Sequence, residues 1–203
     1  MMRTSAKFSV FDMDGTLISL PVDWGSVRSE LQRLTGTALK FNPFFLDVQT
    51  IVAGDPLLLG PIMRTIDHYE ARAVPEACLE EGSMDVLSSL SRRAKLSLVT
   101  MQGRAACERI LDSLGIARFF ATSFTREDSM DRTAQLLAAL KSLGARNSQA
   151  FFVGDRINDL KAARAVGVRF VMIRKRPDSP PADALYRSMT EFAKSPWVMG
   201  SRA

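Results

Sequence analysis

The sequence is poor in the residues that build disulfides and zinc sites: it has one histidine, His68, and two cysteines, Cys78 and Cys107, among 203 residues. The cysteines lie far apart, without CxxC spacing and without a recognisable export signal. We therefore expect buried free thiols and no cysteine-based metal site. His68 lies in a helical pattern, and we expect it to face solvent.

Long hydrophobic runs are also missing. The N-terminal MMRTSAKFSV has no apolar core of a signal peptide, and the most apolar segment, FNPFFLDVQTIVAGDPLLLGPIM, is broken by Asp47, Asp55, Pro56 and Pro61. Neither export nor a membrane span is supported. We expect a cytoplasmic protein with no membrane partner.

Basic residues are in excess, but no nucleic-acid-binding pattern accompanies them. The formal net charge is +5, and the longest basic cluster is RKRP, Arg174 to Pro177. Aromatic residues are not interleaved with the basic ones, so we expect no nucleic-acid partner. A basic surface can instead attract anionic metabolites.

The sequence does contain a regular alternation of short apolar runs and helical patterns. Five runs predict strands: Phe8 to Phe11, Lys95 to Thr100, Arg118 to Ser123, Ala150 to Asp155 and Arg169 to Arg174. Helical patterns between the later runs end at Gly115, Gly144 and Gly167. Strands alternating with helices in this way predict an α/β fold with a parallel five-stranded sheet flanked by helices. After the prolines of the tail, Leu185, Met189 and Phe192 indicate a short amphipathic helix.

One segment breaks the alternation. Residues 18–80 contain no convincing strand, but helical patterns run from Val27 to Leu34, after a possible N-cap at Asp23, and from Leu58 to Tyr69. The segment is too long for a simple crossover. We therefore expect a core domain of residues 1–17 and 81–203, with a small helical domain of residues 18–80 inserted after the first strand.

Polar residues follow three of the predicted strands. The first strand runs into Asp12, Asp14, Gly15 and Thr16, the second into Thr100 and Gln102, and the fourth into Gly154, Asp155 and Asp159. Parallel sheets bind ligands at the carboxyl ends of their strands, so these groups should converge on one crevice. Two carboxylates as close as Asp12 and Asp14 repel each other unless they share a cation or a proton.

These residues resemble the motifs of the haloacid dehalogenase superfamily of phosphatases. DMDGT at Asp12 to Thr16 is similar to the first motif, VT ending at Thr100 to the second, and GDRIND at Gly154 to Asp159 to the fourth. The resemblance implies a Rossmann-like core and identifies the inserted segment with the helical cap of that family. Phosphoglycolate phosphatase-like enzymes are the nearest analogy.

The third motif departs from the family pattern. Where the family usually has Lys-Pro, this chain has TREDSMDRTAQ. Arg132 has the right separation from Asp155, whereas Lys141 is closer and lies inside an amphipathic helix. We take Arg132 as the motif residue and Lys141 as its alternative.

The resemblance implies a role for each motif residue. Asp12 would be the nucleophile and Asp14 the general acid and base, with Thr100 and Arg132 completing the catalytic set. Thr16, Thr100, Gln102 and Arg132 would bind the phosphate group, and Gly154 and Asp159 would support the site. An oxygen-only site of Asp12, the Asp14 carbonyl and Asp155 favours Mg²⁺ over zinc.

The leading hypothesis is a Mg²⁺-dependent phosphatase that hydrolyses a small phosphorylated metabolite through an aspartyl-phosphate. Two alternatives stay open: a sugar-phosphate phosphotransferase or mutase of the same superfamily, and a non-catalytic binding protein on the same fold. Four motif residues, Asp12, Asp14, Thr100 and Asp155, argue against the last. We expect a monomer or a homodimer.

Overall fold

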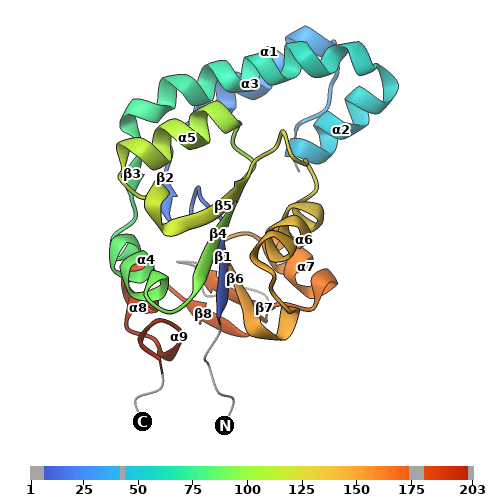
Figure 1. Cartoon of the computed structure of the whole chain (residues 1–203). Coiled ribbons are helices and arrows are strands. Elements are labelled where there is room, and N and C mark those ends of the chain that lie inside the picture. The colour runs from blue at the N-terminus through green and yellow to red at the C-terminus, as the bar shows by residue number, and fades with distance from the viewer. Residues whose placement is uncertain (1–6, 42–43, 174–180, 201–203) are drawn as a thin grey trace. The chain divides into compact units, whose positions relative to one another are not determined.

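The computed structural model describes residues 7–41, 44–173 and 181–200. The chain forms two compact units, one of residues 1–20 and 77–203 and the other of residues 21–76 (Figure 1). The basic cluster Arg174 to Pro177 and the last residue of the fifth expected strand lie outside the described residues.

The larger unit is built on a parallel sheet. Its strand order is β5-β4-β1-β6-β7-β8. The strands are β1 (Phe8–Phe11), β4 (Lys95–Val99), β5 (Phe120–Phe124), β6 (Ala150–Gly154), β7 (Arg169–Ile173) and β8 (Ala184–Tyr186). Strand β1 is central, with Val10 paired to Ser97 on one side and to Phe152 on the other. The order therefore reverses beside β1, which is where such sheets bind ligands.

Helices cover both faces of this sheet. They are α4 (Ser83–Ser91), α5 (Arg104–Ser113), α6 (Arg132–Leu143), α7 (Ile157–Val166), α8 (Met189–Ala193) and α9 (Pro196–Met199). Because side chains alternate along a strand, Phe152 packs in the core formed with α6 and α7, whereas Phe151 contacts the rings of Phe192 and Trp197 on the other face. Short 3₁₀ helices lie at Ala117–Phe119 and Asn147–Gln149.

The α/β fold with a parallel sheet is confirmed, but the predicted count of five strands was wrong by one. The segment around Leu185, which we expected in a helix, pairs with β7 as β8, with Val171 opposite Ala184. Ser188 then caps a separate helix by accepting a hydrogen bond from the Glu191 N–H at 3.2 Å. A three-residue strand is too short to show a period of its own, which is why the pattern misled.

The inserted region is bounded by a second small sheet. Strands β2 (Ile18–Ser19) and β3 (Cys78–Leu79) pair antiparallel. The sequence predicts no strand here, because a two-residue strand is too short to show a periodic pattern. Cys78 is exposed in β3, which corrects its expected burial; Cys107 is buried, and neither of these two cysteines forms a disulfide among the described residues.

The smaller unit is helical. It consists of α1 (Trp24–Thr35), α2 (Phe44–Gly54) and α3 (Leu59–Ala73), with 3₁₀ helices at Pro56–Leu58 and Val74–Glu76. Asp23 caps α1 as predicted, accepting the Ser26 N–H at 3.0 Å. Helices α1 and α3 bury Val27, Leu31, Ile62 and Ile66.

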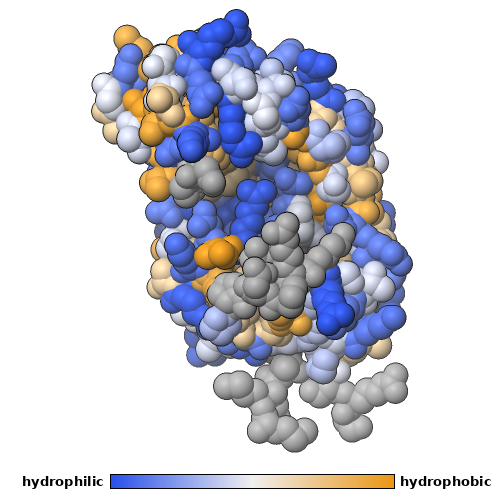
Figure 2. Space-filling model, turned by 180° about the vertical axis from the view of Figure 1, so that it is seen from behind, coloured by the Kyte–Doolittle hydropathy of each residue, from blue (hydrophilic) through white to orange (hydrophobic). Residues whose placement is uncertain are grey.

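The surface mixes polar and apolar residues. On the face drawn in Figure 2, hydrophobic side chains form small patches between hydrophilic ones. No helix in the described part of the chain is long and apolar enough to cross a membrane. His68 is exposed on α3, as expected.

Candidate active site

The turn after β1 brings two carboxylates out of the sheet. Asp12 continues the strand pairing, since its N–H donates to Val153 O at 2.9 Å, and its side chain is buried. The next turn needs Gly15, which has φ +83°. A Cβ at Gly15 would also lie 2.7 Å from Asp155 Oδ2. Glycine thus allows the turn that follows Asp12 to approach Asp155 closely.

Strand β6 supplies the other two carboxylates. It ends at Gly154, and Asp155 and Asp159 follow at the start of α7. A Cβ on Gly154 would lie 2.7 Å from Asp159 Oδ2, so this glycine allows the buried Asp159 side chain to fold back against the strand end. There Asp159 Oδ2 accepts the Arg156 N–H at 3.1 Å.

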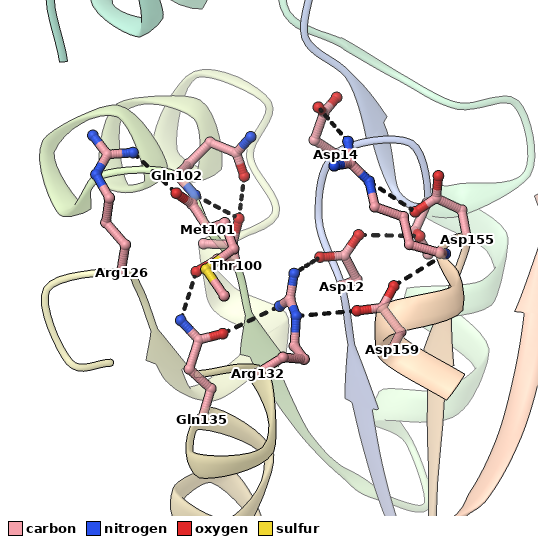
Figure 3. A network of polar contacts seen from close by, with 12 residues as sticks. Asp12, Asp14, Thr100, Met101, Gln102, Arg126, Arg132, Gln135, Asp155 and Asp159 are labelled. Atoms are coloured by element: carbon pink, nitrogen blue, oxygen red, sulfur yellow. Dashed lines mark hydrogen bonds and ion pairs between the residues drawn. The ribbon is translucent and has the colours of Figure 1, made fainter. Parts of the chain in front are cut away.

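Arg132 reaches this acidic group from α6. It is the first residue of that helix, after Asp131, which accepts the Thr133 N–H at 2.7 Å. Its Nη2 donates to Asp12 Oδ1 at 3.0 Å, and its Nε lies 3.0 Å from Asp159 Oδ1 (Figure 3). Lys141 is exposed near the other end of the same helix. Of the two residues considered for the third motif, Arg132 is therefore the one that contacts the carboxylates.

The remaining predicted residues are hydroxyl and amide groups. The Thr16 hydroxyl points to Asp12 Oδ2 at 3.4 Å. Thr100 follows β4; its hydroxyl donates to Gln102 Oε1 and accepts the Gln102 N–H at 3.2 Å. Asp14 accepts the Leu20 N–H at 3.0 Å. The expected site residues thus gather at the carboxyl ends of β1, β4 and β6, with Arg132 added from α6.

The sequence reasoning missed three residues here. Gln135 is buried one helical turn after Arg132 and bonds both Arg132 and the carbonyl of Thr100. Arg126 is buried after β5, and its Nη1 donates to Met101 O at 2.9 Å. Arg156 is exposed, with guanidinium nitrogens 3.9 Å from Asp14 Oδ2 and from Asp155 Oδ1. A polar residue on the buried face of α6 was a usable signal for Gln135. Arg126 follows β5 without a motif, and Arg156 lies inside GDRIND between the residues that carry the resemblance.

The carboxylates form a candidate cation site. Asp12, Asp155 and Asp159 each offer an oxygen within 4.8 Å of the others. Burial raises the pKa of Asp155 to about 7, the charge of Asp12 adds to the effect, and Arg156 opposes it. Burial likewise raises the pKa of Asp159 to about 7, against the effect of Arg132. Negative charge is thus incompletely compensated in this site.

The donors fit a hard divalent cation. Asp155 Oδ1 is buried and has no hydrogen-bond partner among the described residues. Asp159 Oδ1 likewise has no hydrogen-bond partner among the described residues, but Arg132 Nε lies 3.0 Å from it, whereas Arg156 Nε lies 3.9 Å from Asp155 Oδ1. The other oxygen of Asp159 accepts the Arg156 N–H. The nearby guanidinium thus compensates Asp159 more closely than Asp155, which leaves Asp155 the better placed of the two to bind a metal. An all-oxygen set of this kind suits Mg²⁺.

Comparison with known proteins decides the family. The family model described as haloacid dehalogenase-like hydrolase matches residues 48–173. The chain belongs to this family. The family predicted from the motifs at Asp12, Thr100 and Gly154 is confirmed, and the enzyme class is that of a hydrolase.

Curated relatives and solved structures agree with this membership. A phosphoglycolate phosphatase of Agrobacterium fabrum is 25% identical, covering 87% of this chain and 88% of the relative. One from Caulobacter vibrioides is 27% identical, covering 86% and 82%. A haloacid dehalogenase-like family hydrolase from Streptococcus pneumoniae has a similar fold, with a TM-score of 0.72 at 19% identity over 93% of this chain and 97% of that one.

Proposed function

We propose that this chain is a Mg²⁺-dependent phosphatase that hydrolyses a small, phosphoglycolate-like phosphate monoester through an aspartyl-phosphate on Asp12. Its family and its phosphoglycolate phosphatase relatives make it an enzyme that hydrolyses phosphate monoesters. One observation supports the Mg²⁺ dependence and the aspartyl-phosphate route. The buried Asp12 carboxylate is held by Arg132 and lies beside Asp155, which has a buried oxygen that accepts no hydrogen bond from the described part of the chain.

In the first half of the reaction, an Asp12 carboxylate oxygen attacks phosphorus and the bond to the leaving oxygen breaks. The leaving alkoxide takes a proton from Asp14. In the second half, a water molecule gives a proton to Asp14 and attacks the phosphoryl group on Asp12. Inorganic phosphate leaves, and both carboxyl groups return to their starting states.

Cationic and neutral donors position the phosphoryl group. Arg132 already contacts the attacking carboxylate at 3.0 Å, so its guanidinium is placed to interact with phosphoryl oxygens beside Asp12. Thr16, Thr100 and Gln102 supply further donors. In this structure Thr100 and Gln102 bond each other, so they must exchange this hydrogen bond to bind substrate.

Asp12, Asp155 and the backbone carbonyl of Asp14 would hold Mg²⁺, and Gly154 and Asp159 would support them. When bound, the cation lowers the repulsion between the Asp12 carboxylate and the phosphoryl oxygens. Asp159 acts through Arg132, whose Nε it approaches at 3.0 Å.

The helical insertion, predicted as residues 18–80, would act as a cap that selects the substrate. The proposed catalytic residues all belong to the larger unit, so the insertion is not required for the bond-breaking chemistry itself. Contacts with non-reacting parts of a substrate can lower the barrier for the substrates that fit. A cytoplasmic location and a monomeric or homodimeric state stay predictions.

The decisive test is phosphate release from a panel of phosphate monoesters, with and without Mg²⁺. We expect Mg²⁺-dependent release, with small carboxylated esters among the best substrates. Rapid acid quenching should trap a phosphoryl group on the peptide that contains Asp12. A sugar phosphate that isomerises without releasing phosphate would instead identify a mutase, and no turnover of any ester would favour a binding protein.

A further inference from the structure

The amide of Gln135 occupies an unusual position in the site network. The side chain is 1% exposed and lies on the first turn of α6. Its Nε2 lies within hydrogen-bond distance of three backbone carbonyls: Thr100 O at 2.9 Å, Thr125 O at 2.9 Å and Ser129 O at 2.8 Å. Its Oε1 accepts from Arg132 Nη1 at 3.2 Å (Figure 3).

These partners allow only one orientation of the amide. A flipped amide would place Oε1 against three carbonyl oxygens and the NH₂ group against a guanidinium, so that every contact would be repulsive. The carbonyls come from the exit of β4 and from the segment between β5 and α6. Gln135 therefore links both segments to α6, with its NH₂ group towards the carbonyls and its oxygen towards Arg132.

The same amide completes the set of partners around Arg132. The guanidinium has Asp12 at Nη2, Asp159 near Nε and Gln135 at Nη1. A planar fork with a partner on each of its three nitrogens cannot rotate without breaking contacts. A lysine has a single nitrogen and could not be oriented in this way.

We propose that Gln135 is a positioning residue that fixes the Arg132 guanidinium against Asp12 and holds the Thr100 segment in register with it. This inference rests on the proposed phosphatase function, because Arg132 and Thr100 are the groups assigned to the phosphoryl oxygens. Gln135 itself does not touch the reacting atoms. Its effect should therefore appear in the turnover of bound substrate rather than in folding alone.

The kinetic test uses Gln135→Met, which keeps the length of the side chain and removes the amide. With p-nitrophenyl phosphate and Mg²⁺ we expect kcat to fall by about 10²-fold, the loss typical of a misplaced catalytic group, while KM changes less than kcat. Leu143→Ala is the matched control, since Leu143 is buried on the same helix and makes no polar contact with the site. It should lower Tm and leave kcat near the wild-type value.

A double-mutant cycle tests whether Gln135 acts through Arg132. In an Arg132→Lys background, Gln135→Met should cost at least tenfold less in kcat than in the wild type, because lysine lacks the Nη1 group that Gln135 holds. Equal losses in both backgrounds would overturn the inference. So would a Gln135→Met enzyme with wild-type kcat.

A measurement without turnover separates this inference from the proposed function. In ¹⁵N-labelled protein, the guanidinium signal of Arg132 is identified as the one that is missing from Arg132→Lys. In the wild type, this guanidinium should show separate, slowly exchanging Nη resonances. In Gln135→Met these should average, and in Leu143→Ala they should stay separate. If the wild type hydrolyses no phosphate ester but the resonances respond in this way, the proposed function fails and the positioning by Gln135 holds. Unchanged resonances in Gln135→Met would disprove the positioning even in an active enzyme.

Discussion

The two sides of the site differ in how completely their polar groups are satisfied. On the acidic side, Asp12, Asp155 and Asp159 crowd within 4.8 Å, and Asp155 Oδ1 has no hydrogen-bond partner among the described residues. On the amide side, Gln135 uses both its NH₂ group and its carbonyl oxygen in hydrogen bonds. Both sides lie at the same edge of the sheet, and Asp155 is the one of these four residues that is only partly buried.

This difference suits the two sides to different roles. A satisfied buried network is rigid, and it can hold a catalytic group at a fixed place. A crowded set of carboxylates costs folding energy unless something positive joins it. In our proposal the acidic side therefore binds the cation and carries the reaction, and the amide side holds Arg132 and Thr100 in place. Substitutions on the two sides should accordingly differ in their effects on turnover and on stability.

The largest effect should come from the acidic side. Asp12→Asn removes the proposed nucleophile but keeps its shape, so turnover should fall by about 10⁶-fold, the scale seen when a nucleophile is removed. Circular dichroism should show an unchanged fold. Near-normal phosphate release by the pure variant would rule out the covalent route.

Asp14→Asn should lower turnover less than Asp12→Asn. Losing a general acid and base typically costs about 10² to 10⁴ in rate. The loss in kcat/KM, which reports the step in which the leaving group departs, should be greater for an alkyl phosphate than for p-nitrophenyl phosphate, because the nitrophenolate leaves without needing a proton. An equal loss in kcat/KM with both esters would mean that Asp14 does not protonate the leaving group.

Arg132→Ala probes the link between the two sides. We expect a loss of about 10² to 10³ in kcat, the usual cost of removing one donor that stabilises transition-state charge. Lys141→Ala is the control, because Lys141 is exposed on the same helix, and its activity should match the wild type. The reverse result would move the third motif to Lys141.

The acidic side should also make stability and metal binding depend on pH in opposite senses. The pKa of Asp155 is raised from 3.8 to about 7, so between these values the folded state binds more protons than the unfolded state. Without metal, Tm should therefore fall as the pH rises towards about 7 and then level off. Mg²⁺ requires the ionised carboxylate, so its affinity should rise through the same window. Thermal denaturation with chelator and titration calorimetry with Mg²⁺ measure the two trends.

The smallest effect should be on thermal stability. Asp155→Asn removes one buried charge from the crowded group, so it should raise the Tm of the metal-free protein at pH 8 by a few degrees and weaken Mg²⁺ binding. Gln135→Met should lower Tm under the same conditions, because it leaves three carbonyls without their donor. If both substitutions shift Tm in the same direction, the contrast between the two sides is wrong.

Much of the architecture could be predicted from local patterns. The alternation of strands and helices gave the parallel sheet, and Gly144 and Gly167 end α6 and α7 with positive φ as expected. Elements of two or three residues, β2, β3 and β8, were missed. These strands form because a neighbouring strand supplies backbone hydrogen-bond partners, and a local sequence pattern does not show which segments become neighbours.

The sequence by itself determined the family and the acidic side of the site. Asp12, Asp14, Asp155 and Asp159 sit at short, fixed distances from strand ends, so their convergence follows from the rule that parallel strands end at one edge. Only the tertiary structure placed Arg132, and not Lys141, against Asp12 and brought Gln135 against Thr100, Thr125 and Ser129. Those contacts depend on how α6 packs against β4 and β5, and side-chain reach across elements is set by packing, which no spacing along the chain encodes.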